Sequence, residues 1–287
     1  MKIIKVGYIV SYDYSMLLTS IKQLYKHVDK ILVAIDIDRK TWSGNTFKIP
    51  ESFFDEVKTF DTRNIIEFYF DNFYIPSLRP IECETRERNL VLEKLGKGWK
   101  IQLDVDEYIY DFEGVSKYLK RYWYLTFFPK WTPLVFKGKL ITLFKKVDRG
   151  FLYIDNNERF PFITNQTFNT YTRKNNRIRN YYTNISVIHQ SWAREESEII
   201  MKVKNWGHRD DFDTKEYIEF WKRLNKDNYL SIKNFHPIIP VLWKKLEYIE
   251  ANSINDFIEK YSYLNEQKLF PVLIKNQIKA LKNKLIK

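Results

Sequence analysis

The chain has 287 residues, of which 44% are hydrophobic and 17% aromatic, and its formal net charge is +12. This composition excludes a disordered chain, and a single cysteine, Cys83, excludes a disulfide framework and a cysteine-based zinc cluster. The positive charge favours anionic partners, such as phosphorylated substrates, anionic lipid or nucleic acid. The length fits one α/β domain with a small helical appendage.

The first 123 residues alternate strand patterns with helix patterns. Near-continuous apolar runs predict buried strands over residues 2–11, 30–37, 64–70 and 99–103. Apolar residues at helical spacing predict one helix after Asp13, which can cap it, and a second over residues 82–95. This alternation is typical of a parallel, Rossmann-like α/β sheet.

The pattern changes after residue 123. Short strands are expected over residues 126–128, 134–144 and 150–154, without long helices between them. Helical periodicity dominates from residue 195 onward. We therefore expect a mixed sheet flanked by helices in residues 1–194, followed by a helical C-terminal region in residues 195–287. No run approaches the roughly 18 apolar residues that span a bilayer, and no secretory signal opens the chain, so we expect a cytoplasmic protein.

Two carboxylates follow the fourth predicted strand. Asp104 and Asp106 stand two positions apart in the segment LDVDE, residues 103–107. Ligands of open α/β sheets bind at the carboxyl ends of the strands, so both side chains should lie at that edge. There they can converge on Mg²⁺ or Mn²⁺, hard cations that prefer oxygen ligands and share them with substrate phosphates. The alternative is that these acids cap a helix or solvate a turn.

The order of these features resembles the family 2 glycosyltransferases of the GT-A fold, over roughly residues 2–194. The resemblance is carried by a first strand that ends at Ser11 and Tyr12, by acids after the second strand, by the helical segment ETRERN at residues 84–89, and by the Asp104–Asp106 pair. It implies a GT-A domain with a nucleotide-sugar-binding half at residues 1–123 and an acceptor half at residues 124–194. It further implies inverting hexosyl transfer from a nucleotide-sugar, such as a UDP-sugar, to a glycan or lipid-linked acceptor in polysaccharide biosynthesis.

The resemblance also suggests roles for individual residues of the donor site. Asp106, Asp104 and His189 would hold the divalent cation, with Asp104 lying nearer to the ribose and the sugar. Either arginine of the ETRERN segment can bind donor oxygens, and two further cations can close over the diphosphate. The expected donor-binding residues are Ser11, Tyr12, Asp36 or Asp38, Arg86, Arg88, Asp104, Arg194 and Lys202.

An inverting transferase also needs a general base for the acceptor hydroxyl. Glu158 is our choice from the acceptor half, and Asp155 is the alternative. For these acids, as for the arginines, the competing interpretation is a solvated loop or an exposed helix face.

Two other functions share some of these features. A nucleotidyl- or phosphotransferase can use the same carboxylates, but it usually has a Gly-rich phosphate loop near the first strand, and Gly7 stands inside that strand. A non-enzymatic nucleic-acid-binding protein fits the charge, but no recognised nucleic-acid motif is present, so no nucleic-acid partner is expected.

The C-terminal segment at residues 272–287 (VLIKNQIKALKNKLIK) is basic and amphipathic. Its apolar residues recur at helical spacing, and its lysines suit an anionic membrane surface. Two interpretations stay open: peripheral contact at the inner membrane face, or a helix that packs on the protein's own core.

Overall fold

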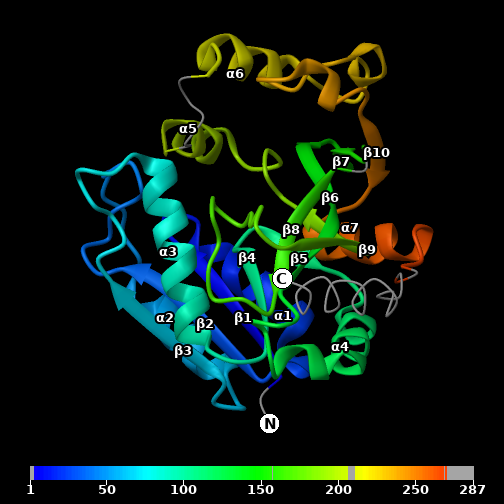
Figure 1. Ribbon diagram of the computed structural model, residues 1–287. Coiled ribbons are helices and arrows are strands. Elements are labelled where there is room, and N and C mark those ends of the chain that lie inside the picture. The colour runs from blue at the N-terminus through cyan, green and yellow to red at the C-terminus, as the bar shows by residue number, and fades with distance from the viewer. Residues whose placement is uncertain (1–2, 157, 206–210, 268, 270–287) are drawn as a thin grey trace.

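The computed structural model describes residues 3–156, 158–205, 211–267 and 269. The described residues form one mixed ten-stranded sheet with helices on both faces (Figure 1). This is the mixed α/β, Rossmann-like architecture that the sequence predicts. The helices are α1 (Leu17–Leu24), α2 (Glu51–Phe60), α3 (Pro80–Leu95), α4 (Phe112–Arg121), α5 (Glu196–Asn205), α6 (Thr214–Arg223) and α7 (Ile254–Leu264). Short 3₁₀ helices are η1 (Tyr14–Met16), η2 (Tyr25–His27), η3 (Trp123–Thr126), η4 (Tyr229–Ser231) and η5 (Pro240–Leu242).

Four parallel strands form the first half of the sheet, in the order β3-β2-β1-β4. They are β1 (Ile4–Val10), β2 (Lys30–Asp36), β3 (Ile66–Asp71) and β4 (Trp99–Asp104). All four predicted strands are confirmed. The apolar residues of β1, β2 and β4 are mostly buried, whereas β3 lies at the edge of the sheet and its apolar residues are half-buried or exposed. In the register, Ile9 lies opposite Asp104 and Asp36 lies opposite Asp71, so the carboxyl ends share one edge of the sheet.

The second half of the sheet is mostly antiparallel. It continues from β4 through β8 (Arg159–Thr164), β6 (Leu134–Val147), β7 (Gly150–Ile154) and β10 (Glu247–Glu250). Strand β9 (Arg179–His189) runs parallel to β6 and pairs with the short β5 (Glu107–Ile109), so that Glu107 lies opposite His189. This pairing joins the acidic turn after β4 to the end of β9, and it creates the site described below.

Two local expectations were wrong. Residues 123–126 form the 3₁₀ helix η3, and the expected strand at 126–128 is absent from the described residues. The C-terminal region is not purely helical, because residues 247–250 form β10 and pair with β7. Strand β10 depends on pairing with β7, about a hundred positions earlier in the chain, which periodicity does not reveal.

Helix α3 covers one face of the parallel strands and packs closely on β1. A Cβ placed on Gly7 would overlap the side chain of Val91, so glycine allows this close approach. Leu32 and Ala34 face α3, whereas Ile31, Val33 and Ile35 face the larger core on the opposite side. Figure 1 shows α3 alongside β1 and β2. Helix α3 therefore carries its side chains directly to the edge where these strands end.

The helices of the described residues include none that is long and apolar enough to cross a bilayer. The amphipathic segment at 272–287 lies outside the described residues, so its two interpretations stay predictions.

Candidate functional site

A cavity of about 390 Å³ lies at the carboxyl ends of β1, β2 and β4. In this sheet the chain leaves β1 for β2 on one side and reaches β4 on the other, and ligands of open α/β sheets bind at such a switch point. Its lining includes Ser11, Tyr12, Asp13, Asp36, Trp42, Glu84, Glu87, Arg88, Asp104, Asp106, His189, Arg194 and Lys202. Most of the predicted donor-site residues therefore lie around one cavity.

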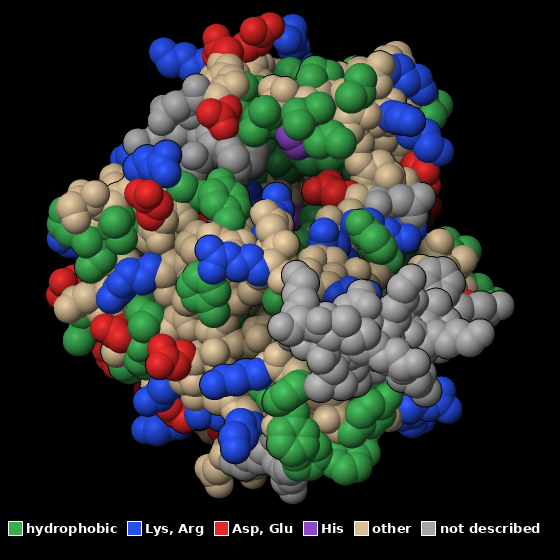
Figure 2. All heavy atoms as spheres, viewed as in Figure 1, with side chains coloured by type: hydrophobic (Ala, Val, Ile, Leu, Met, Phe, Trp, Pro, Cys, Tyr) green, Lys and Arg blue, Asp and Glu red, His purple; other side chains and the backbone are tan. Residues whose placement is uncertain are grey.

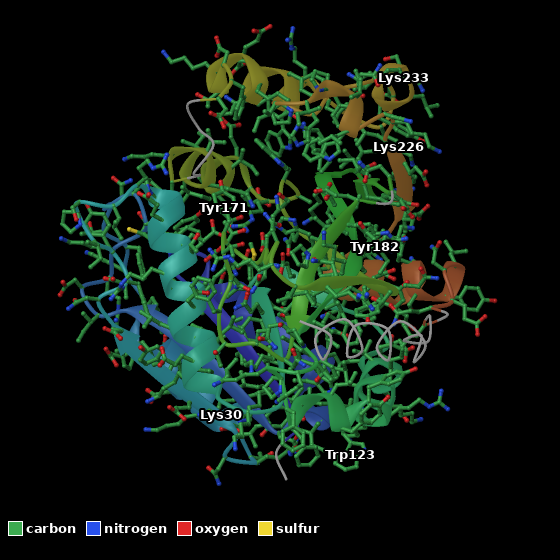
Figure 3. All side chains as sticks on the ribbon, in the orientation of Figure 1. Lys30, Trp123, Tyr171, Tyr182, Lys226 and Lys233 are labelled. Carbon is green, nitrogen blue, oxygen red and sulfur yellow. The ribbon has the colours of Figure 1, made fainter. Side chains whose placement is uncertain are left out.

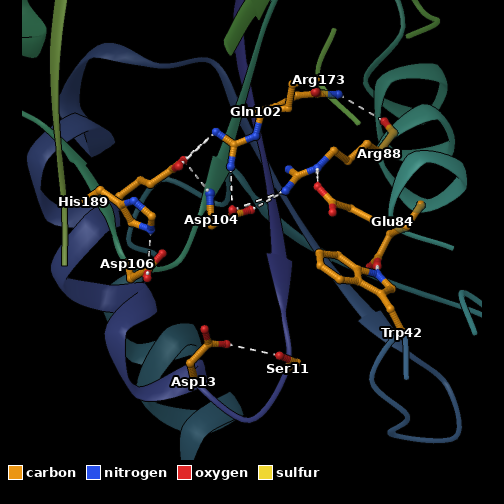
Figure 4. Close-up of polar contacts among 12 residues, drawn as sticks. Ser11, Asp13, Trp42, Glu84, Arg88, Gln102, Asp104, Asp106, Arg173 and His189 are labelled. Atoms are coloured by element: carbon orange, nitrogen blue, oxygen red, sulfur yellow. Dashed lines mark hydrogen bonds and ion pairs between the residues drawn. The ribbon is translucent and has the colours of Figure 1, made fainter. Parts of the chain in front are cut away.

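Asp104 ends β4 and is held by two arginines from different parts of the chain (Figure 4). Arg88 of α3 donates through Nη2 to its Oδ1 at 2.9 Å, and Arg173 from the segment between β8 and β9 donates to its Oδ2 at 2.5 Å. Burial would raise the pKa of Asp104, but the two guanidinium groups outweigh it and hold the pKa below the usual value. Asp104 is therefore a fixed anion at the cavity wall.

Asp106 is buried and faces three nitrogen groups of the C-terminal half. His189 Nε2 lies 3.3 Å and Lys202 Nζ lies 3.5 Å from its Oδ2, and Arg194 donates a hydrogen bond to the same oxygen. Burial would raise the pKa of Asp106, but His189, Lys202 and Arg194 together hold it well below the usual value. The structure brings His189 into contact with Asp106 (Figure 4), because β9 ends beside β5.

Arg173 was missed by the sequence analysis. Besides Asp104, it binds Glu107 through Nη1, at 3.0 and 2.8 Å from the two carboxylate oxygens. Glu107 in turn accepts the backbone N–H of Asp104 at 3.0 Å. Because Arg173 lies in an irregular segment without periodicity or motif, no sequence signal pointed to it. These contacts of Arg173 with Asp104 and Glu107 hold the acidic turn after β4 in place.

Asp13 is a second residue whose role was misjudged. Its side chain makes no helix cap; it accepts a hydrogen bond from Ser11 Oγ at 3.2 Å and lies 3.6 Å from Arg194 Nη2. Burial raises the pKa of Asp13, and Arg194 partly opposes that rise. Asp13 therefore belongs to the cavity, where it shares Arg194 with Asp106.

Arg194 is nearly inaccessible, with 1% of its side chain exposed. Within the described part of the chain, its Nε and Nη1 groups have no hydrogen-bond partner. Burying an unpaired donor costs free energy, and native proteins rarely leave one unsatisfied. Arg194 also lines the cavity. This combination indicates a site for an acceptor group that is itself anionic.

At the opposite wall, Asp36 acts mainly on the backbone. Its two carboxylate oxygens accept N–H groups of Asp38, Lys40, Phe73 and Tyr74, at 2.9–3.0 Å. These four bonds join the loop after β2 to the end of β3. Asp36 still lines the cavity, whereas the side chain of Asp38 is exposed and lies outside the cavity lining. Of the two acids after β2, the structure therefore brings only Asp36 to the site.

Trp42 and Glu87 meet beside Asp36. Trp42 Nε1 donates to Glu87 Oε2 at 2.6 Å, and burial raises the pKa of Glu87 to about 8, although the Trp42 bond opposes this rise. Both residues line the cavity. A carboxyl group that is largely protonated at neutral pH offers a donor as well as an acceptor at this end.

Besides Asp38, three predicted site residues lie elsewhere. Arg86 points away from Arg88 and donates to the carbonyl oxygen of Asn72 at 2.6 Å. Asp155 pairs with Lys139 at 2.6 Å and accepts the hydroxyl of Tyr261, while Glu158 stays in the turn between β7 and β8. None of the three lines the cavity. The structure therefore corrects their placement, and it does not bring either proposed base to the site.

The cavity offers few protein ligands for a divalent cation. In the part of the chain that the structure describes, no group of three or more His, Cys, Asp or Glu side chains is arranged to hold a metal ion. Asp106 and His189 do converge, and they supply the oxygen and imidazole donors that Mn²⁺ accepts. Cations that bridge substrate phosphates commonly use only one or two protein carboxylates.

Comparison with known proteins gives limited guidance. No protein-family model matches the chain, and no curated protein matches it. Among solved structures, TarS 1–349 of S. aureus is 16% identical with a TM-score of 0.30, and the match covers 49% of this chain and 36% of that chain. Mannose-6-phosphate isomerase of Helicobacter pylori is 16% identical with a TM-score of 0.32, covering 53% and 55%. HddC of Yersinia pseudotuberculosis is 8% identical with a TM-score of 0.35, covering 64% and 92%.

The chain thus spans about a third to a half of the length of the first two proteins. Similarities at this level support no argument about activity. A functional assignment has to come from the cavity itself.

Proposed function

We propose that this protein is a glycosyltransferase that moves a sugar from a nucleotide-sugar donor, a UDP-sugar, to a glycan or lipid-linked acceptor with inversion. The observation that carries the proposal is Arg194, a buried guanidinium whose Nε and Nη1 atoms have no partner among the described residues, in a cavity at the carboxyl ends of parallel strands. A diphosphate supplies the anionic acceptor oxygens that such a group requires. The resemblance to family 2 glycosyltransferases supports the choice of a sugar donor.

The charges around the cavity fit a nucleoside diphosphate. Lys202 of α5 stands beside Arg194, and burial lowers its pKa although Asp106 opposes this. Arg194 uses Nη2 for Asp106, so Nε and Nη1 can bind phosphate oxygens without breaking that contact. We infer that Arg194 and Lys202 bind the diphosphate and stabilise the negative charge that develops on it as the sugar departs.

We assign a divalent cation, Mn²⁺ or Mg²⁺, to Asp106 and His189. Such a cation neutralises charge on the leaving diphosphate. Asp104 is held by Arg88 and Arg173, so we place it as a fixed acceptor for hydroxyl groups of the ribose or sugar. Ser11 and Tyr12 lie along the same wall, and the Trp42–Glu87 pair closes the end that we assign to the nucleobase.

Titration with UDP, with and without Mn²⁺, tests the donor site by calorimetry. Arg194→Met should lower UDP affinity at least about tenfold, because a hydrogen bond to a charged group contributes about 1.5–3 kcal/mol. Arg86→Met is the matched control, since it removes an arginine outside the cavity, and it should bind UDP like the parent protein. His189→Ala should lower the affinity for Mn²⁺, measured in the presence of UDP, at least about tenfold.

The reaction itself is tested by a screen of nucleotide sugars for release of the nucleoside diphosphate. Release of UDP that stops in excess chelator is expected. Full activity with chelator present would contradict the metal assignment, and equal UDP affinity in Arg194→Met would contradict the donor site. Formation of pyrophosphate from UTP and a sugar phosphate would instead identify a nucleotidyltransferase.

A further inference from the structure

A cluster of exposed aromatic rings follows helix α4, far from the cavity. Trp123, Tyr124, Phe127, Phe128 and Trp131 are 41–69% exposed, and they stand within nine residues of one another. We call residues 123–131 the aromatic patch. Figure 2 shows hydrophobic side chains gathered at the lower edge of this face, where Figure 3 places Trp123. Contiguous exposed apolar surface on a folded domain usually marks an interaction site.

The chain around the aromatic patch carries charge of one sign. Residues 114–131 contain four lysines and arginines and no aspartate or glutamate, and one of the four, Lys117, pairs with Glu113. Lys120, Arg121 and Lys130 are exposed beside the rings. An apolar protein partner would not require this bias, whereas an anionic surface would be attracted by it.

We propose that the aromatic patch binds the surface of an anionic lipid bilayer. Tryptophan and tyrosine favour the bilayer–water interface, because their rings are apolar and their N–H and O–H groups stay hydrated. Lysine and arginine beside them gain energy from anionic headgroups. The basic segment at 271–287 shares the charge of the patch rim, so charge favours lipid over this segment as the occupant.

The geometry sets how the protein lies on such a surface. The Leu119 carbonyl, near the end of α4, accepts the indole N–H of Trp99, the first residue of β4. Asp104 ends the same strand, and six residues of strand span roughly 20 Å. The aromatic patch and the cavity therefore lie at opposite ends of the parallel strands. In Figure 3, Trp123 lies at the lower edge, well below Tyr171 of the cavity lining. The bilayer contact is thus a tether that leaves the cavity facing away from the lipid, and it favours the glycan acceptor of the proposed function over the lipid-linked one.

Co-sedimentation of the full chain with vesicles tests this proposal. Vesicles of phosphatidylcholine with phosphatidylglycerol should bind the protein, and vesicles of phosphatidylcholine alone should bind it much less. A triple variant, Trp123→Ser with Phe128→Ser and Trp131→Ser, should lose at least about tenfold in partition. Lys120→Glu with Arg121→Glu should also lose about tenfold or more, because each basic residue contributes to attraction by the anionic surface.

The matched control removes exposed apolar side chains elsewhere. Leu230→Ser with Val241→Ser and Tyr263→Ser alters residues that are 62–89% exposed, and it should leave vesicle binding unchanged. All variants should keep the circular dichroism spectrum and the UDP affinity of the parent, since none touches the cavity. Bromine-labelled lipid should quench tryptophan fluorescence in the parent and not in Trp123→Phe with Trp131→Phe.

Three results would overturn the proposal. The first is equal sedimentation of the parent and the triple variant. The second is binding that disappears when the chain ends at Phe270 but persists in the triple variant, which would assign the contact to residues 271–287. The third is a change of oligomeric state in the triple variant, measured by light scattering, without any change in vesicle binding, which would make the patch an interface between copies of this chain.

Discussion

Replacing Asp106 by asparagine should destabilise the fold as well as the function. The carboxylate is the shared partner of Arg194, Lys202 and His189, and its side chain is 4% exposed. Asparagine keeps the shape of aspartate, so no cavity forms and the effect is electrostatic.

The magnitude follows from what each partner can do afterwards. Lys202 can lose a proton, because burial already lowers its pKa. Arg194 cannot deprotonate, and its next carboxylate is Asp13, 3.6 Å away. Removing one member of a buried ion pair costs about 3–5 kcal/mol. We expect Asp106→Asn to lower the free energy of unfolding by about that amount, a large part of the roughly 5–15 kcal/mol of a typical domain.

Urea unfolding, followed by circular dichroism and tryptophan fluorescence in chelator, measures this effect without a metal contribution. Asp38→Asn is the matched control, because that aspartate is exposed and should change stability by less than about 0.5 kcal/mol. Adding Arg194→Met to Asp106→Asn should recover part of the loss, since the uncompensated charge is then gone. If Asp106→Asn unfolds within about 0.5 kcal/mol of the parent, the electrostatic reasoning is refuted.

Two further changes test the other buried carboxyl groups. Burial raises the pKa of Glu87 from 4.5 to about 8 in the folded protein. The stability that the protonated Glu87 side chain contributes is therefore complete below the pKa of the unfolded chain, and it is lost as the pH rises through the pKa of the folded protein. Between about pH 5 and about pH 8, ionisation of Glu87 should lower the free energy of unfolding by up to about 4 kcal/mol. The free energy of unfolding of Glu87→Gln, measured by denaturation, should depend less on pH. An unchanged pH dependence would show that Glu87 is already ionised in the folded protein. Arg173→Met should destabilise the protein by about 1–3 kcal/mol, and more at alkaline than at acidic pH, because burial raises the pKa of Glu107 and Arg173 opposes it. A loss that does not vary with pH would contradict that account.

The sequence by itself predicted most of the parallel half of the fold, although helix α2 (Glu51–Phe60) was missed. Continuous apolar runs and helical spacing are local properties, and they predicted β1 to β4 and helix α3 within a few residues. The position of Asp104 and Asp106 after the fourth strand also followed, because the carboxyl ends of parallel strands share one edge. His189 was named from the resemblance, and the pairing of β9 with β5 brings it to Asp106.

Whether the other predicted residues reach the cavity depends on the direction in which each side chain points. Arg86 and Arg88 are two positions apart on α3, and 3.6 residues per turn place them on nearly opposite sides of the helix. The sequence analysis named both arginines, and the packing of α3 on β1 turns only Arg88 toward the cavity. Asp155 and Glu158 were chosen by position along the chain, which does not reveal that Lys139 and Tyr261 hold Asp155 elsewhere.

Only the tertiary structure could identify Arg173, Asp13 and the aromatic patch. Arg173 reaches Asp104 and Glu107 from more than sixty positions away. The sequence suggested that Asp13 caps a helix, whereas the structure places it beside Arg194. The rings of residues 123–131 are of the same kinds as those in the core, and only the packing of α4 and β6 leaves them exposed. Local patterns report backbone preference and burial of a face, whereas contacts between distant segments are decided when the whole chain packs.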